Sequence, residues 1–420
     1  MRRPLTLVLV LIASPLWAVD WDVPLRDGAI AETLDLAAPG DTLRLRPGTY
    51  VEKTLLDKSV TLDGGGVATL DGGGQGSVVT ITAPNAVVQG LTIVGSGSDH
   101  ESIDSGVQLL KGATGAVVRD NHLIGNLYGV DIHGAHDALV IDNRIDGRQD
   151  RRMNDRGNGI YVWNAPGAQV TGNDVRWGRD GIFVNSSKRN LFSDNRFRDL
   201  RFAVHYMYVN NSEVSGNISI GNDLGYAVMF SKRVRVTGNL SVNDREHGIM
   251  LNYTNSSEIT GNSVQNGENR CAFLYNSNKN TFSGNRFQGC EIGIHFTAGS
   301  ADNQITGNAF IANRTQVKYV STRWDEWSMD GVGNHWSDFA AYDVDGNGIA
   351  DTAYRPNDVM DQVLWTQPAA KLLLGSPAVQ LVRWSQAAFP ALLPGGVMDS
   401  FPLMQPAPVS VPEFGGDLDG

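Results

Sequence analysis

The sequence predicts an all-β chain that folds as a right-handed parallel β-helix, a solenoid with coils of about 22 residues. Two observations predict this fold. One asparagine recurs at a nearly constant spacing, and a short alternating strand follows most of its copies. A short helical cap is expected before the coils, and a helical or irregular extension is expected after them.

The recurring asparagine marks one corner of each expected coil. Its copies are Asn121, Asn143, Asn173, Asn195, Asn217, Asn239, Asn262, Asn285 and Asn308. Their spacings are 22, 30, 22, 22, 22, 23, 23 and 23 residues. An asparagine amide can satisfy the backbone groups of a turn, and asparagine tolerates the left-handed backbone conformation. Stacked copies are therefore expected to form an amide ladder along the solenoid.

The alternating strand has the pattern small, apolar, any, apolar, any. Examples are Gly159-Ile-Tyr-Val-Trp163 and Gly181-Ile-Phe-Val-Asn185. This period of two is typical of strands, and no helical period lies between the strands. A leucine-rich horseshoe would need leucine at fixed positions and commonly a helical turn in each repeat, and neither is present.

The predicted organisation begins with an export signal. Residues 1–18 combine Arg2 and Arg3, the apolar stretch Leu5 to Ala13, and a small Ala18 before the cleavage point. The mature chain is therefore expected in the periplasm, associated with the inner membrane only through a partner. The expected units that follow are a cap at 19–39 containing a helix from Ala29 to Ala38, the β-helix at 40–320, a Trp- and Asp-rich cap at 321–366, and an apolar tail at 367–420.

The longest spacing, between Asn143 and Asn173, indicates an inserted loop at Gly147 to Asp155. Its charges fit either a working loop or simple solvation. The net charge of the chain is −11, which argues against nucleic acid as a partner.

A calcium loop is a candidate in the expected cap. Asp343, Asp345, Asn347 and Asp351 stand at positions 1, 3, 5 and 9 of the pattern, with glycine at position 6. Tyr354 occupies position 12, where the pattern has glutamate. The alternative is a loop of Asx turns without a metal.

The two cysteines, Cys271 and Cys290, fall on neighbouring coils two positions apart in coil register. With a rise of about 4.8 Å between coils, their Cα atoms come within disulfide range. We predict that they form a disulfide in the oxidising periplasm.

A row of outward positions carries unusual side chains. The first row consists of the residue between the two apolar positions of each strand: Asp131, Tyr161, Phe183, His205, Met229, Met250, Leu274 and His295. Two positions further along, a second row on the same face is His133, Trp163, Asn185, Met207 and Ser231. Thioethers and imidazoles suit Cu(I). We predict one copper ion at His205, Met207, Met229 and Met250, with His247 as a further ligand. A metal-free docking strip is the alternative.

An enzyme is not expected. Many right-handed β-helices are polysaccharide lyases or epimerases that use carboxylates on one strand face, and Asp131 with His133 could be interpreted in that way. No further carboxylate stands beside them in the row, and neither a zinc spacing nor a serine-nucleophile motif is present.

Six segments resemble the NosD family, which assists maturation of the copper enzyme nitrous-oxide reductase. They are His205-Tyr-Met-Tyr208, Gly225-Tyr-Ala-Val-Met-Phe230, His247-Gly-Ile-Met-Leu-Asn-Tyr253, Gly289 to Gly299, Gln316 to Val320 and Gly333-Asn-His-Trp-Ser-Asp338. The similarity runs from about Gly40 to Met404. It implies a periplasmic, non-enzymatic role with three partners: an ABC-type permease with its cytoplasmic ATPase, a copper-chaperone lipoprotein, and the reductase. It implies no agreed set of metal ligands.

The apolar tail is the candidate for docking to the permease. Ser376-Pro377 resembles a helix start, and Ala378 to Phe389 is the expected helix. Its apolar residues, with their neighbours, are Leu372, Leu373, Leu374, Val379, Leu381, Val382, Trp384, Phe389, Leu392 and Leu393.

Overall fold

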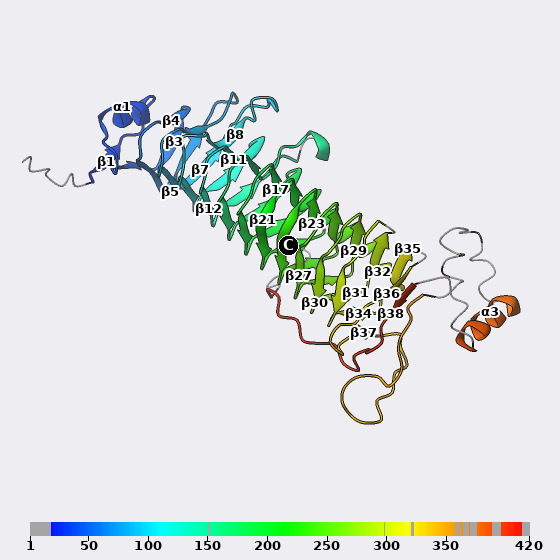
Figure 1. Ribbon diagram of the computed structural model, residues 1–420. Coiled ribbons are helices and arrows are strands. Elements are labelled where there is room, and N and C mark those ends of the chain that lie inside the picture. Colours follow the sequence, from blue (N-terminus) through cyan, green and yellow to red (C-terminus); the bar gives the residue numbers. More distant parts are fainter. Residues whose placement is uncertain are drawn as a thin grey trace, which may run out of the picture.

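The computed structural model describes residues 18–149, 152–297, 299–320, 323–357, 361, 363, 369, 376–388 and 396–413. These residues form a long right-handed parallel β-helix (Figure 1), as the sequence predicts. All but one residue of the expected signal peptide, and much of the tail around its helix, lie outside the described residues. Within the described part, no helix is both long and apolar enough to cross a bilayer.

One face of the solenoid is a sheet of twelve parallel strands, stacked in chain order. These strands are β4 (Thr54–Leu56), β6 (Val79–Ile81), β8 (Ser105–Leu109), β11 (Tyr128–His133), β14 (Ile160–Trp163), β17 (Asp180–Asn185), β20 (Phe202–Met207), β23 (Leu224–Met229), β26 (His247–Asn252), β29 (Arg270–Tyr275), β32 (Ile292–Thr297) and β35 (Thr315–Val320). Inward residues such as Val204, Val228 and Leu251 are buried, and the residues between them face outward.

The other two faces belong to one sheet of 24 strands, because two long strands at its start contribute to both faces. These long strands are β5 (Thr61–Asp71) and β7 (Val87–Val94). The first of these faces continues through β1 (Asp20–Val23), β2 (Thr42–Leu45), β9 (Val117–Arg119), β12 (Leu139–Ile141), β15 (Gln169–Thr171), β18 (Leu191–Ser193), β21 (Asn210–Ser215), β24 (Lys232–Thr237), β27 (Glu258–Thr260), β30 (Thr281–Ser283) and β33 (Gln304–Thr306). The second continues through β3 (Gly48–Val51), β10 (His122–Ile124), β13 (Arg144–Asp146), β16 (Asp174–Arg176), β19 (Arg196–Arg198), β22 (Ile218–Ile220), β25 (Leu240–Val242), β28 (Ser263–Gln265), β31 (Arg286–Gln288), β34 (Ala309–Ile311) and β37 (His335–Trp336).

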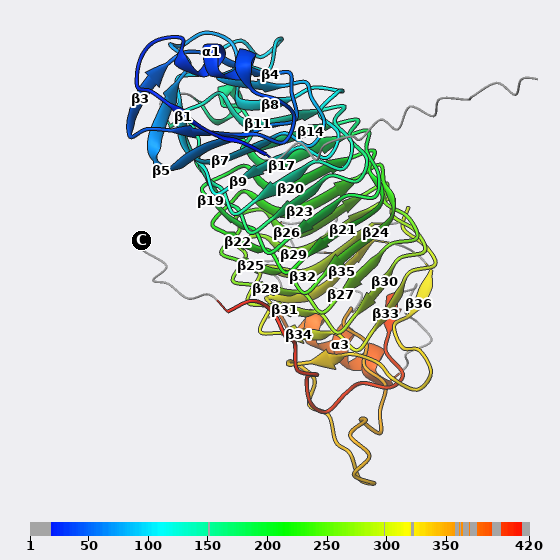
Figure 2. The same ribbon diagram turned by 90° about the vertical axis from the view of Figure 1, so that its left-hand side faces the viewer.

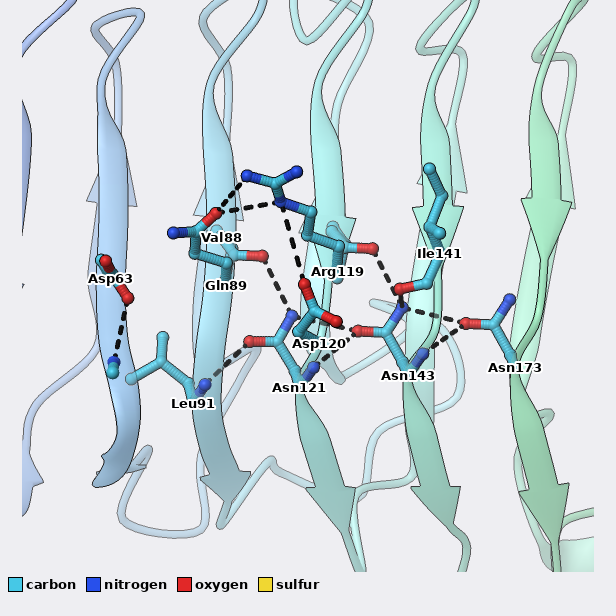
Figure 3. Close-up of polar contacts among 12 residues, drawn as sticks. Asp63, Val88, Gln89, Leu91, Arg119, Asp120, Asn121, Ile141, Asn143 and Asn173 are labelled. Carbon is cyan, nitrogen blue, oxygen red and sulfur yellow. Dashed lines mark hydrogen bonds and ion pairs between the residues drawn. The ribbon is translucent and has the colours of Figure 1, made fainter.

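The asparagine ladder is continuous, and Figure 3 shows its first three members. The side-chain oxygen of Asn143 accepts hydrogen bonds from the backbone N and the Nδ2 of Asn121, at 3.1 and 3.0 Å. Asn173 repeats this arrangement for Asn143, and the series runs on to Asn308 and Asn334. From Asn121 to Asn308 the left-handed residue is the one before the ladder asparagine, for example Gly216 at φ 64°, and not the asparagine itself as expected.

The N-terminal end of the solenoid is covered by α1 (Ala29–Leu36), which ends two residues earlier than expected. Its Ile30 and Leu34 are buried against the first coils. The inserted loop contains a short 3₁₀ helix, Met153–Asp155, and the side chain of Arg148 donates to the carbonyl oxygens of Ser96 and Gly97.

The C-terminal end is closed by an aromatic cap. Trp336 stacks on Phe310 with ring centroids 4.5 Å apart, and Trp327 is fully buried beside them. The buried Asp399 accepts hydrogen bonds from the backbone N of Asn334 and from the indole of Trp336, both at 2.7 Å. Residues 396–404 therefore belong to this cap, together with the parallel pair β36 (Trp324–Glu326) and β38 (Gly396–Met398).

The helix α3 (Pro377–Ala388) lies beyond this cap (Figures 1 and 2). Ser376 caps it as expected, since its hydroxyl accepts a hydrogen bond from the backbone N of Val379 at 3.3 Å. Cys271 and Cys290 are joined by a disulfide, with their Cα atoms 5.7 Å apart.

Candidate metal centre

The twelve-stranded sheet shows two outward columns of side chains, defined by the strand register. The first column is Gln108, Asp131, Tyr161, Phe183, His205, Ala227, Met250, Phe273, His295 and Lys318. The second is His133, Trp163, Asn185, Met207, Met229, Asn252 and Tyr275. Histidine, methionine and aromatic side chains therefore do gather on this face.

Two positions of the expected first row are wrong, and so is Ser231 in the second row, which is buried and accepts a hydrogen bond from the backbone N of Val209. Met229 pairs with Met207, so it lies in the second column, and Ala227 takes its place beside His205. Leu274 faces the core with no exposed surface, and Phe273 takes the outward position.

The corrected register places Ala227 at the centre of the four predicted ligands. His205 precedes it and Met250 follows it in the same column, while Met229 stands two positions further along its own strand. Met207 is the diagonal neighbour. Ala227 points outward yet has no exposed surface, so neighbouring side chains close over its methyl group. This small residue lets long side chains converge above it.

His205 is held by a buried carboxylate. Its Nδ1 lies 3.1 Å from Oδ2 of Asp180, and its ring packs between Phe183 and Phe202. Its Nε2 is buried and has no partner among the described residues. In a neutral imidazole whose Nδ1–H is donated to Asp180, Nε2 keeps a free lone pair, which is the arrangement that second-shell carboxylates give metal-binding histidines.

Asp180 was not identified from the sequence. It begins β17, 25 residues before His205, and no local motif joins the two. Arg201 also binds it, with Nε and Nη2 at 2.8 and 2.7 Å. Burial acts to raise the pKa of Asp180, but the hydrogen bonds from His205 and Arg201 outweigh burial and lower it.

His247 lies apart from this group. It pairs with Leu224 and Arg270 at the start of β26, and its ring packs on Phe273 at 5.1 Å. Its Nε2 faces Nη1 of Arg270 at 3.5 Å. Burial, followed by the charge of Arg270, lowers the pKa of His247 to about 4.

The chemistry of the four residues around Ala227 is that of a soft site. Three thioethers and one imidazole favour Cu(I) and give little affinity for Ca(II) or Zn(II). Across the described residues, no group of three or more His, Cys, Asp and Glu side chains is placed to hold a metal ion. A metal site on this face would therefore depend on methionine.

An exposed aromatic ladder borders the methionines. Tyr208, Phe230 and Tyr253 directly follow Met207, Met229 and Asn252, and neighbouring rings stack at 5.2 and 5.3 Å. All three have a left-handed backbone, with φ between 50 and 57°. Bulky residues seldom adopt this conformation. The ladder is an apolar surface beside the candidate ligands.

The carboxylates of the candidate calcium loop are hydrogen-bonded to the backbone of the loop itself. The carboxylate of Asp343 accepts from the backbone N of Gly346, Asn347 and Gly348, and these hydrogen bonds lower its pKa. Asp351 accepts from the backbone N of Val344 at 2.8 Å. Asp345 and Asn347 form Asx turns, since each side-chain oxygen accepts from the backbone N two residues further on. Calcium binding stays a prediction.

Asp131 and His133 do not form a hydrogen-bonded pair, since His133 Nδ1 is 3.9 Å from Oδ2 of Asp131. Asp131 has no exposed surface, its Oδ2 accepts from Gln108 at 3.1 Å, and its Oδ1 has no partner within the described part of the chain. Burial raises the pKa of Asp131 to about 7.

The tail helix presents apolar side chains to solvent. Leu381 and Trp384 are 64 % and 67 % exposed on adjacent turns of α3, whereas Val379 is buried. The expected tail residues 372–374, 389, 392 and 393 lie outside the described residues.

Solved structures with a similar fold include the A-module of the mannuronan C-5 epimerase AlgE6 from Azotobacter vinelandii, with a TM-score of 0.54 and 15 % identity over 72 % of this chain and 96 % of that one. A family 28 exopolygalacturonase from Yersinia enterocolitica has a TM-score of 0.56 and 12 % identity over 72 % of this chain and 77 % of that one. At this identity the likeness shows the fold alone.

The fold and the face with histidine and methionine define a β-helix protein with a candidate soft-metal site. Residues 141–341 match the model of the family described as periplasmic copper-binding protein (NosD). A protein of Pseudomonas aeruginosa named probable ABC transporter binding protein NosD is 42 % identical over 386 residues, covering 89 % of this chain and 90 % of its own length. A Stutzerimonas stutzeri protein of the same name is 41 % identical over 388 residues, covering 89 % of each. The chain belongs to the NosD family.

Proposed function

We propose that this chain is a non-enzymatic periplasmic copper carrier, which accepts Cu(I) and delivers it for maturation of nitrous-oxide reductase together with an ABC-type transporter. Membership of a family described as periplasmic and copper-binding supports the location and the metal. The names of the relatives support the transporter. The observation that carries the proposal is the set of four soft ligands around Ala227.

The carrier role follows from the position of this set. His205, Met207, Met229 and Met250 lie on the outer face of the sheet, so a partner can reach an ion held there without any opening of the core. Thioethers bind Cu(I) and exchange it readily with other soft ligands. The aromatic ladder of Tyr208, Phe230 and Tyr253 gives a partner an apolar surface beside the ion. The copper-chaperone lipoprotein and the reductase are the partners that we assign to this surface.

Cu(I) titration of the purified chain against a chromogenic chelator tests the site. We expect one Cu(I) per chain. Replacing both Met229 and Met250 by leucine should keep the fold, because volume and apolar character are retained, and should remove the ion. The matched control is Met329→Leu, since this exposed methionine lies in the cap. Equal Cu(I) affinity in the double variant and the parent would leave the face as a metal-free docking strip.

A second variant tests the geometry without touching a ligand. Ala227→Leu fills the space in which the four side chains meet and should also abolish Cu(I) binding. Replacing Ala203, a buried alanine on the preceding strand, is unsuitable as a control because it disturbs the core. Asn185→Leu, which changes an outward residue two coils before Ala227, provides the control instead. Unchanged Cu(I) binding in Ala227→Leu would contradict a site centred there.

We propose that the tail helix α3 binds the permease. The cap contacts of residues 396–404 mean that removal of the whole tail would uncover the end of the solenoid. The sharper test is the pair Leu381→Ser and Trp384→Ser, which leaves the cap intact. The variant should stay folded and no longer co-purify with the permease. Retention of the complex would remove α3 from the interface.

The rival function is a polysaccharide lyase or epimerase. The observation that favours it is the buried Asp131, whose Oδ1 has no partner among the described residues. Incubation of the purified chain with alginate and with polygalacturonate tests for this activity. Turnover that is lost in Asp131→Asn would overturn the carrier proposal.

A further inference from the structure

Four basic side chains gather on the last coils of the twelve-stranded sheet. They are His247, Arg270, His295 and Lys318, from β26, β29, β32 and β35. His295 and Lys318 are direct neighbours in the strand register. This group, which we call the basic cluster, begins on the strand of Met250 and continues over the next three coils, and it includes His247, the further copper ligand expected from the sequence.

Phe273 holds the basic cluster together. The rings of His247 and His295 pack on it from either side, at 5.1 and 5.0 Å between centroids. The guanidinium carbon of Arg270 lies 5.0 Å from the same ring centroid. Arg270 also approaches His247, with 3.5 Å between Nη1 and Nε2. The aromatic ring therefore fixes the positions of three basic groups on one side of the sheet.

The basic cluster has unused hydrogen-bonding capacity. Nε of Arg270 and Nδ1 of His295 are both buried, and neither has a partner among the described residues. Neither Arg270 nor Lys318 takes part in any ion pair found in that part of the chain. Elsewhere on the solenoid, arginines such as Arg201 and Arg314 are paired with carboxylates. In a chain with net charge −11, an unbalanced positive cluster is unusual.

The electrostatics agree with this geometry. Burial, then the charges of Arg270 and Lys318, lowers the pKa of His295 to about 3. Burial and Arg270 also lower the pKa of Lys318. The charge of Glu246 acts to raise the pKa of Arg270, but burial has the larger effect and lowers it. Arg270 and Lys318 thus carry positive charge that Glu246 offsets only in part and that no ion pair among the described residues balances.

We propose that the basic cluster is an anion-binding site, which takes a carboxylate or a tetrahedral oxyanion through Arg270, His295 and Lys318. A half-buried guanidinium is suited to ligands that present two oxygens. Lys318 supplies a second positive charge, and Nδ1 of His295 supplies a donor when it carries the proton. The site is independent of the copper proposal, because it uses none of the four residues around Ala227.

Titration of the full mature chain with inorganic phosphate, and separately with acetate, tests the site in a buffer free of other oxyanions. Calorimetry gives the affinity, and ring-nitrogen NMR signals of labelled histidines give the location. Phosphate or acetate should bind in a saturable manner and move the His295 signals. Because a bound anion favours the charged imidazole, it should raise the pKa of His295. Binding of phosphate alone identifies a tetrahedral oxyanion as the ligand, and binding of acetate identifies a carboxylate.

Arg270→Gln and Lys318→Gln should each weaken binding about tenfold or more, since each removes a charged hydrogen bond. The matched controls are Arg233→Gln and Lys188→Gln, which change exposed cations outside the twelve-stranded sheet. Circular dichroism checks that each variant is folded. Absence of saturable binding of both anions would overturn the proposal. Equal losses in the site and control variants, or binding that leaves His295 unchanged, would overturn it as well.

Discussion

Removal of one amide from the asparagine ladder should destabilise the solenoid strongly. Asn217 has no exposed surface. Its Oδ1 accepts from the backbone N and the Nδ2 of Asn195, at 3.0 and 2.9 Å. Its Nδ2 donates to the carbonyl oxygen of Phe192 at 2.9 Å and to Oδ1 of Asn239 at 2.9 Å. The change Asn217→Ala removes all of these contacts at once.

The magnitude follows from the groups left behind. The buried N–H of Asn195 loses its acceptor, and leaving such a donor unpaired costs about 1–3 kcal/mol. The other lost hydrogen bonds contribute about 0.5–1.5 kcal/mol each, and they are not fully additive. We therefore expect a loss of roughly 3 kcal/mol in the free energy of unfolding. This is large against the stability of about 5–15 kcal/mol that is typical of native proteins.

Urea denaturation followed by circular dichroism measures the loss, and hydrogen exchange locates it. The amide of Asn195 should lose protection before the amides of distant coils, because solenoid coils contact only their neighbours. Asn185→Ala is the control, since this outward asparagine is not part of the ladder. A midpoint that moves no further than in the control, with Asn195 still protected, would refute the reasoning.

Four further predictions follow from buried or bridged groups. Asp131→Asn should stabilise the chain by roughly 2–4 kcal/mol at pH 8, because the pKa of Asp131 in the folded chain is about 7 against an ordinary 3.8. Between pH 4 and pH 7, roughly, the Asp131 carboxyl keeps its proton only in the folded state. The parent should therefore lose stability as the pH rises from about 4 to 7. Below about pH 4 the urea midpoints of parent and variant should be equal. Native and denatured protein should both lack free thiols, and replacing Cys271 and Cys290 by alanine should cost about 3 kcal/mol in the free energy of unfolding; two titratable thiols would contradict the bridge. Asp180→Asn should weaken Cu(I) binding about 10–100-fold without removing a ligand, and unchanged affinity would separate Asp180 from the site. Calcium should raise the thermal midpoint of the parent but not of Asp343→Ala, and equal midpoints with calcium and with chelator would leave the loop as Asx turns alone.

The period of the fold was predictable because each coil carries the same asparagine for the same physical reason. The strand phase was harder to predict at two coils. In β23 the bulky Tyr226 faces the core, where its hydroxyl donates to the carbonyl oxygens of Asn217 and Leu240. The small Ala227 faces outward in the same strand. Hydrophobicity alone therefore assigned the inward and outward positions of β23 incorrectly, and Met229 was placed in the column of His205.

The candidate site was only partly predictable for a related reason. Residue type identified His205 and the methionines, because soft ligands are rare on a solvent face. The roles of Ala227 and Asp180 depend on which residues of successive coils are neighbours. A spacing that varies between 22, 23 and 30 residues does not define those neighbours until every loop is placed. The basic cluster was missed because its members come from four different coils.

The asparagine ladder also gives the solenoid a dipole along its axis. In every step, the side-chain oxygen accepts from the preceding coil, and one side-chain N–H donates to the amide oxygen of the following coil, so these hydrogen bonds all point the same way along the axis and polarise one another. The positive end of this series lies at the C-terminal coil, where Asn334 is the last member. There the acceptor for its backbone N is not another amide but the buried carboxyl of Asp399. A residue supplied by the far C-terminal segment thus acts on the ladder as an acidic residue acts on the N-terminus of a helix. A coil array cut before Asp399 would keep its hydrogen-bonded rungs but would end on an uncompensated partial charge.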